Sequence, residues 1–330
     1  MISHRERLRA CLAGELPDRT PVALWRHFPV DDQSPETLAA ATLHWQQQYD
    51  FDFVKVTPAS SFAVKDWGVE DVWEGHTEGT RRYTKRVISG PSDWARLREL
   101  DPTSPHLADQ LTCLRQIRAG LDPETPVIQT VFSPLAQAKN LAGNETLLAH
   151  LRLHPEAVLQ GLEIIARSTR RFVEAALDLG IDGIFYAVQH AQAAMLSFEE
   201  YKLFGLPFDH QAIEPARDSW LNVLHLHGRD IHFSILPFMH FPVVNWHDRE
   251  TYPNLTEALA AYNGVVCGGL RQDTLVFGNP LEVQNEASDA IQQTGGRRFI
   301  LSTGCVVPVI APHGNLESVR SAAFRPLVAG

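Results

Sequence analysis

The chain has 330 residues, of which 44% are hydrophobic and 21% are charged, and its formal net charge is −10. This length accommodates one α/β barrel or two ordinary domains, and the composition is typical of a soluble globular protein. An acidic chain is a poor partner for nucleic acid, because phosphate binding relies on clustered Lys and Arg. No window approaches the roughly 18 apolar residues that span a bilayer, so we expect no membrane segment.

The cysteines indicate a reducing compartment. The chain has four cysteines, which are widely spaced and form no CxxC pair: Cys11, Cys113, Cys267 and Cys305. This pattern favours free thiols over a disulfide framework. The first seven residues are polar and contain no apolar signal core. We therefore expect a cytoplasmic protein.

Short apolar runs alternate with longer amphipathic patterns from end to end. The predicted strands, in chain order, are residues 21–24, 53–56, 127–131, 183–185, 221–226, 241–245, 264–267 and 299–302. The predicted helices are residues 36–49, 104–119, 155–179, 197–219 and 280–294. Strands that alternate with helices predict a parallel sheet with right-handed crossovers. Eight such units are typical of a (β/α)8 TIM barrel.

Segment 66–87 departs from this alternation. Its Gly, Trp, Thr and Tyr content predicts a small β-hairpin inserted after the second strand. No linker or repeat interrupts the chain, so residues 1–330 are expected to form a single barrel domain. A doubly wound open sheet is the alternative, but it normally carries a glycine-rich loop after the first strand. The run Trp25-Arg26-His27-Phe28-Pro29 follows that strand here, which favours the barrel.

Polar side chains follow the predicted strands, where a barrel places its catalytic groups. The residues that we expect to shape a pocket are Arg26, His27, Tyr186, Gln189 and His247. Arg26 could hold a carboxylate or phosphate through two hydrogen bonds, or form a salt bridge across the barrel mouth. Tyr186 or Gln189 could donate a proton, or simply pack at the rim. His247 is either an oriented imidazole or the start of a loop.

Two histidines and a cysteine form a candidate zinc site. Strand alternation places His225 and His227 on one face, and Cys305 follows the eighth predicted strand. Strands five and eight open onto the same barrel mouth, so the two pieces are expected to meet. Three such ligands with one open position are typical of catalytic zinc. The alternatives are hydrogen-bonded histidines and a small buried cysteine.

Several segments resemble the uroporphyrinogen decarboxylase superfamily. They are residues 5–22, residues 196–204, Cys267-Gly-Gly-Leu270 and Phe299-Ile-Leu-Ser-Thr-Gly-Cys305. Each segment alone is a weak signal, but the order and spacing of all four together are specific. The segments together cover nearly the whole chain. The resemblance implies the TIM barrel already inferred. It also implies one of two reactions, which belong to two branches of the superfamily.

The resemblance is closer to one branch than to the other. True uroporphyrinogen decarboxylases carry an arginine-rich stretch after the first strand and an aspartate after the second. Here residues 25–30 keep one arginine, and residues 56–61 contain no aspartate. The other branch comprises zinc-dependent methyltransferases, which move a methyl group between a corrinoid protein and a thiol.

The methyltransferase branch implies zinc ligands in an HxC motif and a later Gly-Cys motif. His225 and Cys305 match, whereas His227 stands where a cysteine is usual. An imidazole in place of a thiolate makes the zinc complex one unit more positive. Such a zinc is expected to hold a thiol more tightly as thiolate and to leave it less nucleophilic.

The sequence leaves three functions open. The first is a zinc-dependent methyltransferase with a thiol-type acceptor and a corrinoid or small methylated donor. Its partners would be a small-molecule substrate and a corrinoid protein, and the chain could form a homodimer. The second is a decarboxylase of tetrapyrrole biosynthesis. The third is a non-catalytic barrel that binds a corrinoid or a porphyrin.

Overall fold

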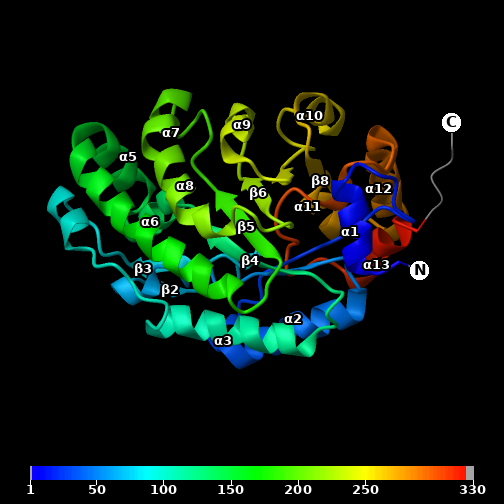
Figure 1. The fold of residues 1–330 in the computed structure, drawn as a ribbon, viewed down its shortest axis with the longest axis horizontal. Coiled ribbons are helices and arrows are strands. Elements are labelled where there is room, and N and C mark those ends of the chain that lie inside the picture. The colour runs from blue at the N-terminus through cyan, green and yellow to red at the C-terminus, as the bar shows by residue number, and fades with distance from the viewer. Residues whose placement is uncertain (1, 325–330) are drawn as a thin grey trace.

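The computed structural model describes residues 2–324 and shows an α/β protein built on a curled parallel sheet (Figure 1). Within this range the sheet has seven strands, in the order β1 (Val54–Val56), β4 (Val127–Phe132), β5 (Gly183–Val188), β6 (Val223–Leu226), β7 (Val243–Trp246), β8 (Val265–Leu270) and β9 (Phe299–Thr303). Every neighbouring pair is parallel. The architecture is consistent with a TIM-like barrel, whose strand ends meet at one face.

Helices connect the strands and cover the sheet. They are α1 (His4–Leu12), α2 (Pro35–Tyr49), α3 (Pro105–Gly120), α4 (Pro134–Ala142), α5 (Asn144–Leu153), α6 (Pro155–Leu177), α7 (Phe198–Phe204), α8 (Leu206–Ile213), α9 (Leu236–Met239), α10 (Leu255–Ala261), α11 (Gln272–Phe277), α12 (Pro280–Thr294) and α13 (His313–Ala322). Figure 1 shows α5, α7, α9 and α10 along the upper edge of the view, and α2 and α3 along the lower edge. Among the described residues, no helix combines the length and apolar character needed to cross a bilayer.

The helix predicted for residues 197–219 is interrupted. The structure instead has α7, α8 and a short 3-10 turn at Glu214–Ala216. Gly205 stands between the two helices, and Pro207 lies in the first turn of α8. A proline has no N–H to continue the preceding helix, and a glycine is a poor helix former, so the chain restarts here.

The segment predicted as the first strand is not a strand in the structure. Val22 makes only an isolated parallel bridge with Leu301. Pro21 has no N–H to donate, and the N–H of Val22 donates to Asp52 Oδ2 at 2.7 Å. Backbone bonds still join Ala23 N to Leu301 O at 3.1 Å and Asp52 N to Val22 O at 2.8 Å. This segment therefore links β9 to the residues just before β1.

A second, two-stranded sheet follows β1 in the chain. Its strands β2 (Glu70–Val72) and β3 (Arg82–Lys85) are antiparallel. The loop between them passes against His27, because a Cβ built on Gly79 would lie 2.5 Å from His27 Cβ. Gly79 also has φ +77°, a conformation that favours glycine. This small sheet therefore approaches the residues that follow segment 21–24.

Asp52 is a buried anchor for the amino-terminal part of the chain. Its carboxylate accepts hydrogen bonds from Arg7 Nη1 at 2.8 Å, Arg19 Nη1 at 2.7 Å and the Val22 N–H. His4 Nδ1 lies 3.0 Å from its Oδ1. Burial favours the neutral acid, but the bonds from His4 and Arg19 outweigh it and hold the pKa of Asp52 well below its usual range.

We expect Asp52→Ala to lower the free energy of unfolding by about 3–5 kcal/mol, because it leaves two buried guanidinium groups without their shared carboxylate. Urea denaturation of the wild type and variant measures the loss. Asp218, which is exposed, is the control, and Asp218→Ala should change stability by less than about 0.5 kcal/mol. Equal stability of the two variants would contradict the anchoring role.

His4 gives this anchor a dependence on pH. Burial alone would lower the pKa of His4, but hydrogen bonds with Asp50 and Asp52 raise it from 6.5 to about 9. A pKa raised in the folded state stabilises the protein fully below the unfolded value and loses that effect as the pH rises through the folded value. We expect the free energy of unfolding to fall between pH 6.5 and 9 more steeply in the wild type than in His4→Gln. Parallel pH profiles of the two proteins would contradict this.

Candidate metal centre

Four side chains converge where β6, β7 and β9 end. His225 lies in β6, His227 and His247 directly follow β6 and β7, and Cys305 follows β9 by two residues. One ligand atom of each lies within 4.8 Å of the others. Cys305 Sγ is 3.8 Å from His227 Nδ1. These four residues are called the His/Cys cluster below.

Strand register explains why the cluster forms. His225 pairs with Asn245 and Leu226 pairs with Trp246, so the next residues, His227 and His247, emerge side by side. The ring centroids of His227 and His247 are 5.4 Å apart. The chain after β9 reaches them through a close backbone contact at Gly304, where a Cβ would lie 2.6 Å from His247 Cα. Any larger residue at this position would push the chain, and with it Cys305, away from His247.

Asn245 determines which nitrogen of His225 faces the cluster. Its Nδ2 donates to the carbonyl oxygens of Cys267 at 2.8 Å and Thr303 at 2.9 Å. Its Oδ1 therefore faces His225 Nδ1, 2.7 Å away, and must accept a hydrogen bond from it. The proton is thus held on Nδ1, which leaves the Nε2 lone pair of His225 free to bind a metal.

The electrostatics of the cluster favour neutral imidazoles. Burial, reinforced by the neighbouring rings, lowers the pKa of His225 well below its usual value and that of His227 to about 4. Burial also lowers the pKa of His247, whose Nε2 has no hydrogen-bond partner. Burial raises the pKa of the Cys305 thiol to about 12. The cluster therefore offers imidazole lone pairs and a thiol that would lose its proton to a metal.

These donors fit zinc. Bonds of 2.0–2.3 Å in a tetrahedral site place ligand atoms roughly 3.3 to 3.6 Å apart. The cluster atoms lie within 4.8 Å, so shortening the longest separation by roughly 1.2 to 1.5 Å would close the set around one ion. His225, His227 and Cys305, the ligands expected from the sequence, are all members. His247, which we expected to shape the pocket, is a fourth candidate ligand, and its position after β7 matches that of His227 after β6.

His27 and Gln189 lie beside two lysines that border the cluster. His27 is buried, and burial together with the charge of Lys55 lowers its pKa to about 3. Gln189 Oε1 accepts a hydrogen bond from Lys139 Nζ. The charge of Lys139 in turn contributes, after burial and His247, to the lowered pKa of His227.

The structure does not bring Tyr186 to the cluster, contrary to our expectation. Its hydroxyl donates to Asp209 Oδ1 at 2.6 Å, on α8 outside the sheet. The preceding residue, Phe185, faces the cluster instead and stacks on His225 with ring centroids 5.3 Å apart. Tyr186 was expected to follow a strand ending at residue 185, but β5 continues to Val188, so Tyr186 lies inside the strand and points to the face opposite that of Phe185.

Arg26 is also directed elsewhere. Its guanidinium carbon lies 5.0 Å from the ring centroid of Phe28 and 4.9 Å from that of Trp45. Its Nη1 donates to the carbonyl oxygen of Val309 at 3.4 Å. Stacking against two aromatic rings holds the guanidinium against α2 and the chain after β9.

Sequence reasoning gave no role to three residues of this region: Lys55, Lys139 and Asn245. Lys55 is buried within β1, and burial lowers its pKa to about 7. Lys139 is on α4, and burial lowers its pKa to about 8. A lysine inside an apolar strand and an asparagine inside another were the available signals, because such groups are buried only where they have a partner or a function.

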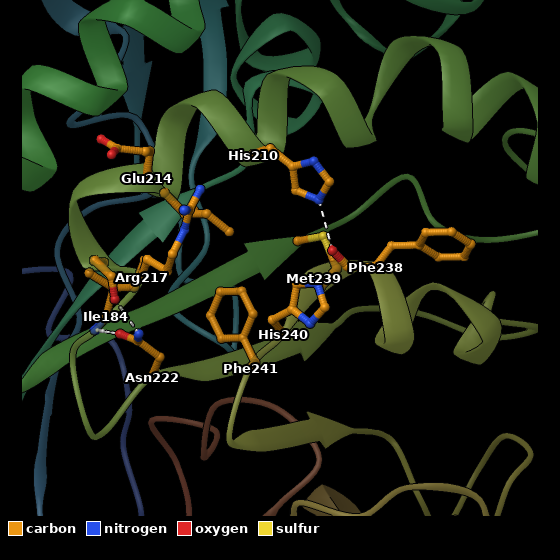
Figure 2. Close-up of a pocket in the computed structure, with 11 residues that line it drawn as sticks. Ile184, His210, Glu214, Arg217, Asn222, Phe238, Met239, His240 and Phe241 are labelled. Atoms are coloured by element: carbon orange, nitrogen blue, oxygen red, sulfur yellow. Dashed lines mark hydrogen bonds between the residues drawn. The ribbon is translucent and has the colours of Figure 1, made fainter.

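A cavity of about 460 Å³ lies outside the cluster, on the outer side of the sheet (Figure 2). Its floor includes Ile184 and Phe241, and its rim includes Arg217, while none of the cluster residues lines it. Figure 2 shows Phe241 beneath His210, with Phe238 pointing away from the other labelled residues. The crossover between β6 and β7 contains a 3-10 turn at Phe233–Ile235 and the one-turn helix α9, and no longer helix covers this space.

Comparison with known proteins places the chain in a family. Residues 3–325 match the family model described as Uroporphyrinogen decarboxylase (URO-D). The chain belongs to the uroporphyrinogen decarboxylase family. This confirms the resemblance seen in the sequence. A search of curated proteins finds no match.

Solved structures with the same fold include methyl-transferring enzymes. A methyltransferase from Methanosarcina mazei aligns with TM-score 0.82 and 18% identity, covering 98% of each chain. A B12-independent methionine synthase from Shewanella sp. W3-18-1, in complex with selenomethionine, aligns with TM-score 0.57 and 13% identity over 92% of each chain. A putative vitamin-B12 independent methionine synthase from Listeria monocytogenes aligns with TM-score 0.55 and 9% identity, over 92% of this chain and 94% of that one. At these identities the likeness shows a shared fold.

We expect Asn245→Ala to weaken zinc binding by about 10- to 100-fold, because His225 loses the acceptor that fixes its tautomer. Competition between metal-free protein and a chromophoric chelator measures the affinity. Asn222 is a matched control, since its buried carboxamide also makes three hydrogen bonds, all of them to backbone groups of Ile184, Ala216 and Ser219, at the opposite end of β6. Asn222→Ala should destabilise the fold and leave zinc affinity unchanged. Equal zinc affinity in both variants would contradict the orienting role.

Proposed function

We propose that this family member is a zinc-dependent methyltransferase, which transfers a methyl group from a corrinoid or small methylated donor to a thiol-type acceptor. His225, His227 and Cys305 would hold the metal, with His247 beside them. The observation that carries the proposal is the convergence of four ligand atoms within 4.8 Å, backed by an asparagine that orients one of them.

The residues of the cluster suit the activation of a thiol. When bound, zinc lowers the pKa of a coordinated thiol, so that the acceptor is a thiolate at neutral pH. Asn245 keeps the proton of His225 on Nδ1, and burial keeps all three imidazoles neutral. His225 is buried, whereas His227 and His247 are partly exposed, so an acceptor would approach from their side. Cys305 would be the only anionic ligand, which leaves more positive charge at the metal than two thiolates would.

The donor is the second part of the proposal. We infer a corrinoid carried by a partner protein, with a small methylated compound as the other source. The similarity in fold to a methyltransferase supports methyl transfer as the reaction class. The methionine synthases that share the fold are B12-independent by their descriptions, so the fold accommodates more than one methyl donor.

Decarboxylation of a tetrapyrrole has less support. A polyanionic tetrapyrrole needs several cationic partners. The one arginine after the first predicted strand, Arg26, stacks on Trp45 and bonds to the backbone of Val309.

We expect protein purified without chelator to contain about one zinc per chain, as measured by inductively coupled plasma mass spectrometry. His225→Ala should lose most of this zinc, because it removes a ligand. His44→Ala should retain it, since His44 is exposed on α2. Zinc near zero in the wild type, or equal zinc in both variants, would overturn the metal assignment.

The methyl-transfer activity requires a separate assay. With methylcobalamin as donor and a small thiol as acceptor, loss of the donor's absorbance should require the protein, stop after chelation and return with added zinc. Turnover of uroporphyrinogen that survives chelation would instead establish the decarboxylase.

A further inference from the structure

The cavity on the outer side of the sheet is separate from the His/Cys cluster. It is lined in part by Asn222, which stands just before β6, whereas His227 stands just after that strand. A strand rises about 3.3 Å per residue, so about 16 Å of chain separates these two residues. The volume of about 460 Å³ falls within the range of about 300–1,000 Å³ that small-molecule sites occupy. A small molecule held here would not reach the candidate metal centre.

The inner wall of this cavity is apolar. Ile184, Met239 and Phe241 line it, and all three side chains are buried. Asn222 is polar, but both N–H groups of its carboxamide already donate to backbone carbonyl oxygens, at 2.6 and 3.1 Å. A polar group pressed against this wall would lose its hydration and find no partner, which costs free energy. The part of a ligand that lies against the wall must therefore be apolar.

The size of the cavity favours a small molecule over a protein segment. An α-helix about 10 Å across, with a rise of about 1.5 Å per residue, occupies about 120 Å³ per residue. The cavity of about 460 Å³ would therefore hold only about one turn of a partner helix. Its walls are also tied together, because His210 Nε2 on α8 lies 2.8 Å from the carbonyl oxygen of Phe238 on α9 (Figure 2). A compact ligand fits this space better than a helix does.

The rim of the cavity carries an unpaired cation. Arg217 is exposed, and its guanidinium forms no ion pair within residues 2–324. Glu214 is the only carboxylate among the described residues that line the cavity, and its Oε2 already lies 3.0 Å from Arg170 Nη2. Figure 2 shows Arg217 below Glu214 in the view, with the ring of Phe241 between Arg217 and His240. Positive charge at the rim thus adjoins an apolar wall.

We propose that this cavity binds a small amphipathic anion, whose apolar body lies against Phe241 and whose carboxylate or sulfonate pairs with Arg217. A guanidinium presents N–H groups in a planar fork that matches such an oxyanion. The imidazole of His240 also lines the cavity and supplies a further N–H. The site is independent of the metal and of the methyl transfer proposed above, because it lies at the other end of the strands.

Two fluorescent probes test this site, because anilinonaphthalene sulfonate and phenylnaphthylamine differ only in the sulfonate. We expect fluorescence titration of the full-length protein to show one saturable site for each probe. Arg217→Gln should weaken binding of the sulfonate by about three- to tenfold, because a charge-assisted hydrogen bond is lost, and should change binding of the neutral amine by less than about twofold. Arg115→Gln is the matched control, since Arg115 is exposed on α3 and forms no ion pair within residues 2–324 either. It should leave the affinity for both probes unchanged.

A second substitution tests the apolar wall. Ala216 lines the cavity and is buried, so Ala216→Phe should fill part of the space and weaken binding of both probes by at least about tenfold. Near-UV circular dichroism and the melting temperature show whether this variant keeps the native fold. Arg217→Gln changes an exposed side chain, so its comparison of the two probes decides the case whether or not Ala216→Phe folds.

Several outcomes contradict the proposal. Absence of saturable binding, or affinities for both probes that neither substitution changes, would show that the cavity is not their site. Equal weakening of the two probes by Arg217→Gln would rule out recognition of the anion. Loss of sulfonate binding as the protein self-associates, followed by analytical ultracentrifugation, would show that a second copy of the chain covers the cavity instead. Removal of zinc by a chelator and His225→Ala should both leave sulfonate binding unchanged, which separates this site from the metal centre.

Discussion

The carboxamide of Asn245 joins the strands on which the candidate metal centre depends. The residue belongs to β7, and its side chain bonds to His225 on β6 and to backbone carbonyls of β8 and β9. Because its two N–H groups are used by carbonyls, its oxygen can only face His225. The tautomer of His225, a candidate metal ligand, is thus determined by the register of four strands. The rest of the centre is built outward from this histidine, through the stacked ring of Phe185 to Lys55.

The rules of strand alternation and strand convergence predicted the candidate metal ligands, but they did not predict the residues that surround them. The alternation of β6 and the convergence of parallel strand ends predict that His225, His227 and Cys305 meet. Tyr186 was misplaced because the predicted strand ended at residue 185, whereas β5 continues through Ala187 to Val188 and places Tyr186 inside the strand. Segment 21–24 has strand-like composition, but a side chain distant in sequence, Asp52, takes one of its N–H groups. Contacts of that kind follow from the finished fold and have no local signature.

The charge of the whole chain and the charge of the site have opposite signs. The chain carries a net charge of −10, yet two lysines border a cluster of neutral imidazoles. Beyond about 10 Å, salt screens the negative surface, so an anionic ligand is influenced mainly by the groups that it touches. The charge state of this centre therefore depends mainly on burial, which lowers the pKa of both lysines and of the three imidazoles.

The backbone N–H of Ala23 donates to the carbonyl oxygen of Leu301, so β9, the strand before Cys305, contacts a segment from the beginning of the chain. This long-range arrangement bears on when the candidate metal centre can form during synthesis. Cys305 follows β9, which pairs with β8, so this candidate ligand joins the three histidines only after the chain has been made through β9. Contacts between residues so distant in sequence form slowly and late. A chain made only as far as β8 would present His225, His227 and His247 without their thiol partner. Binding of a metal by all four side chains would thus require a chain that extends through Cys305.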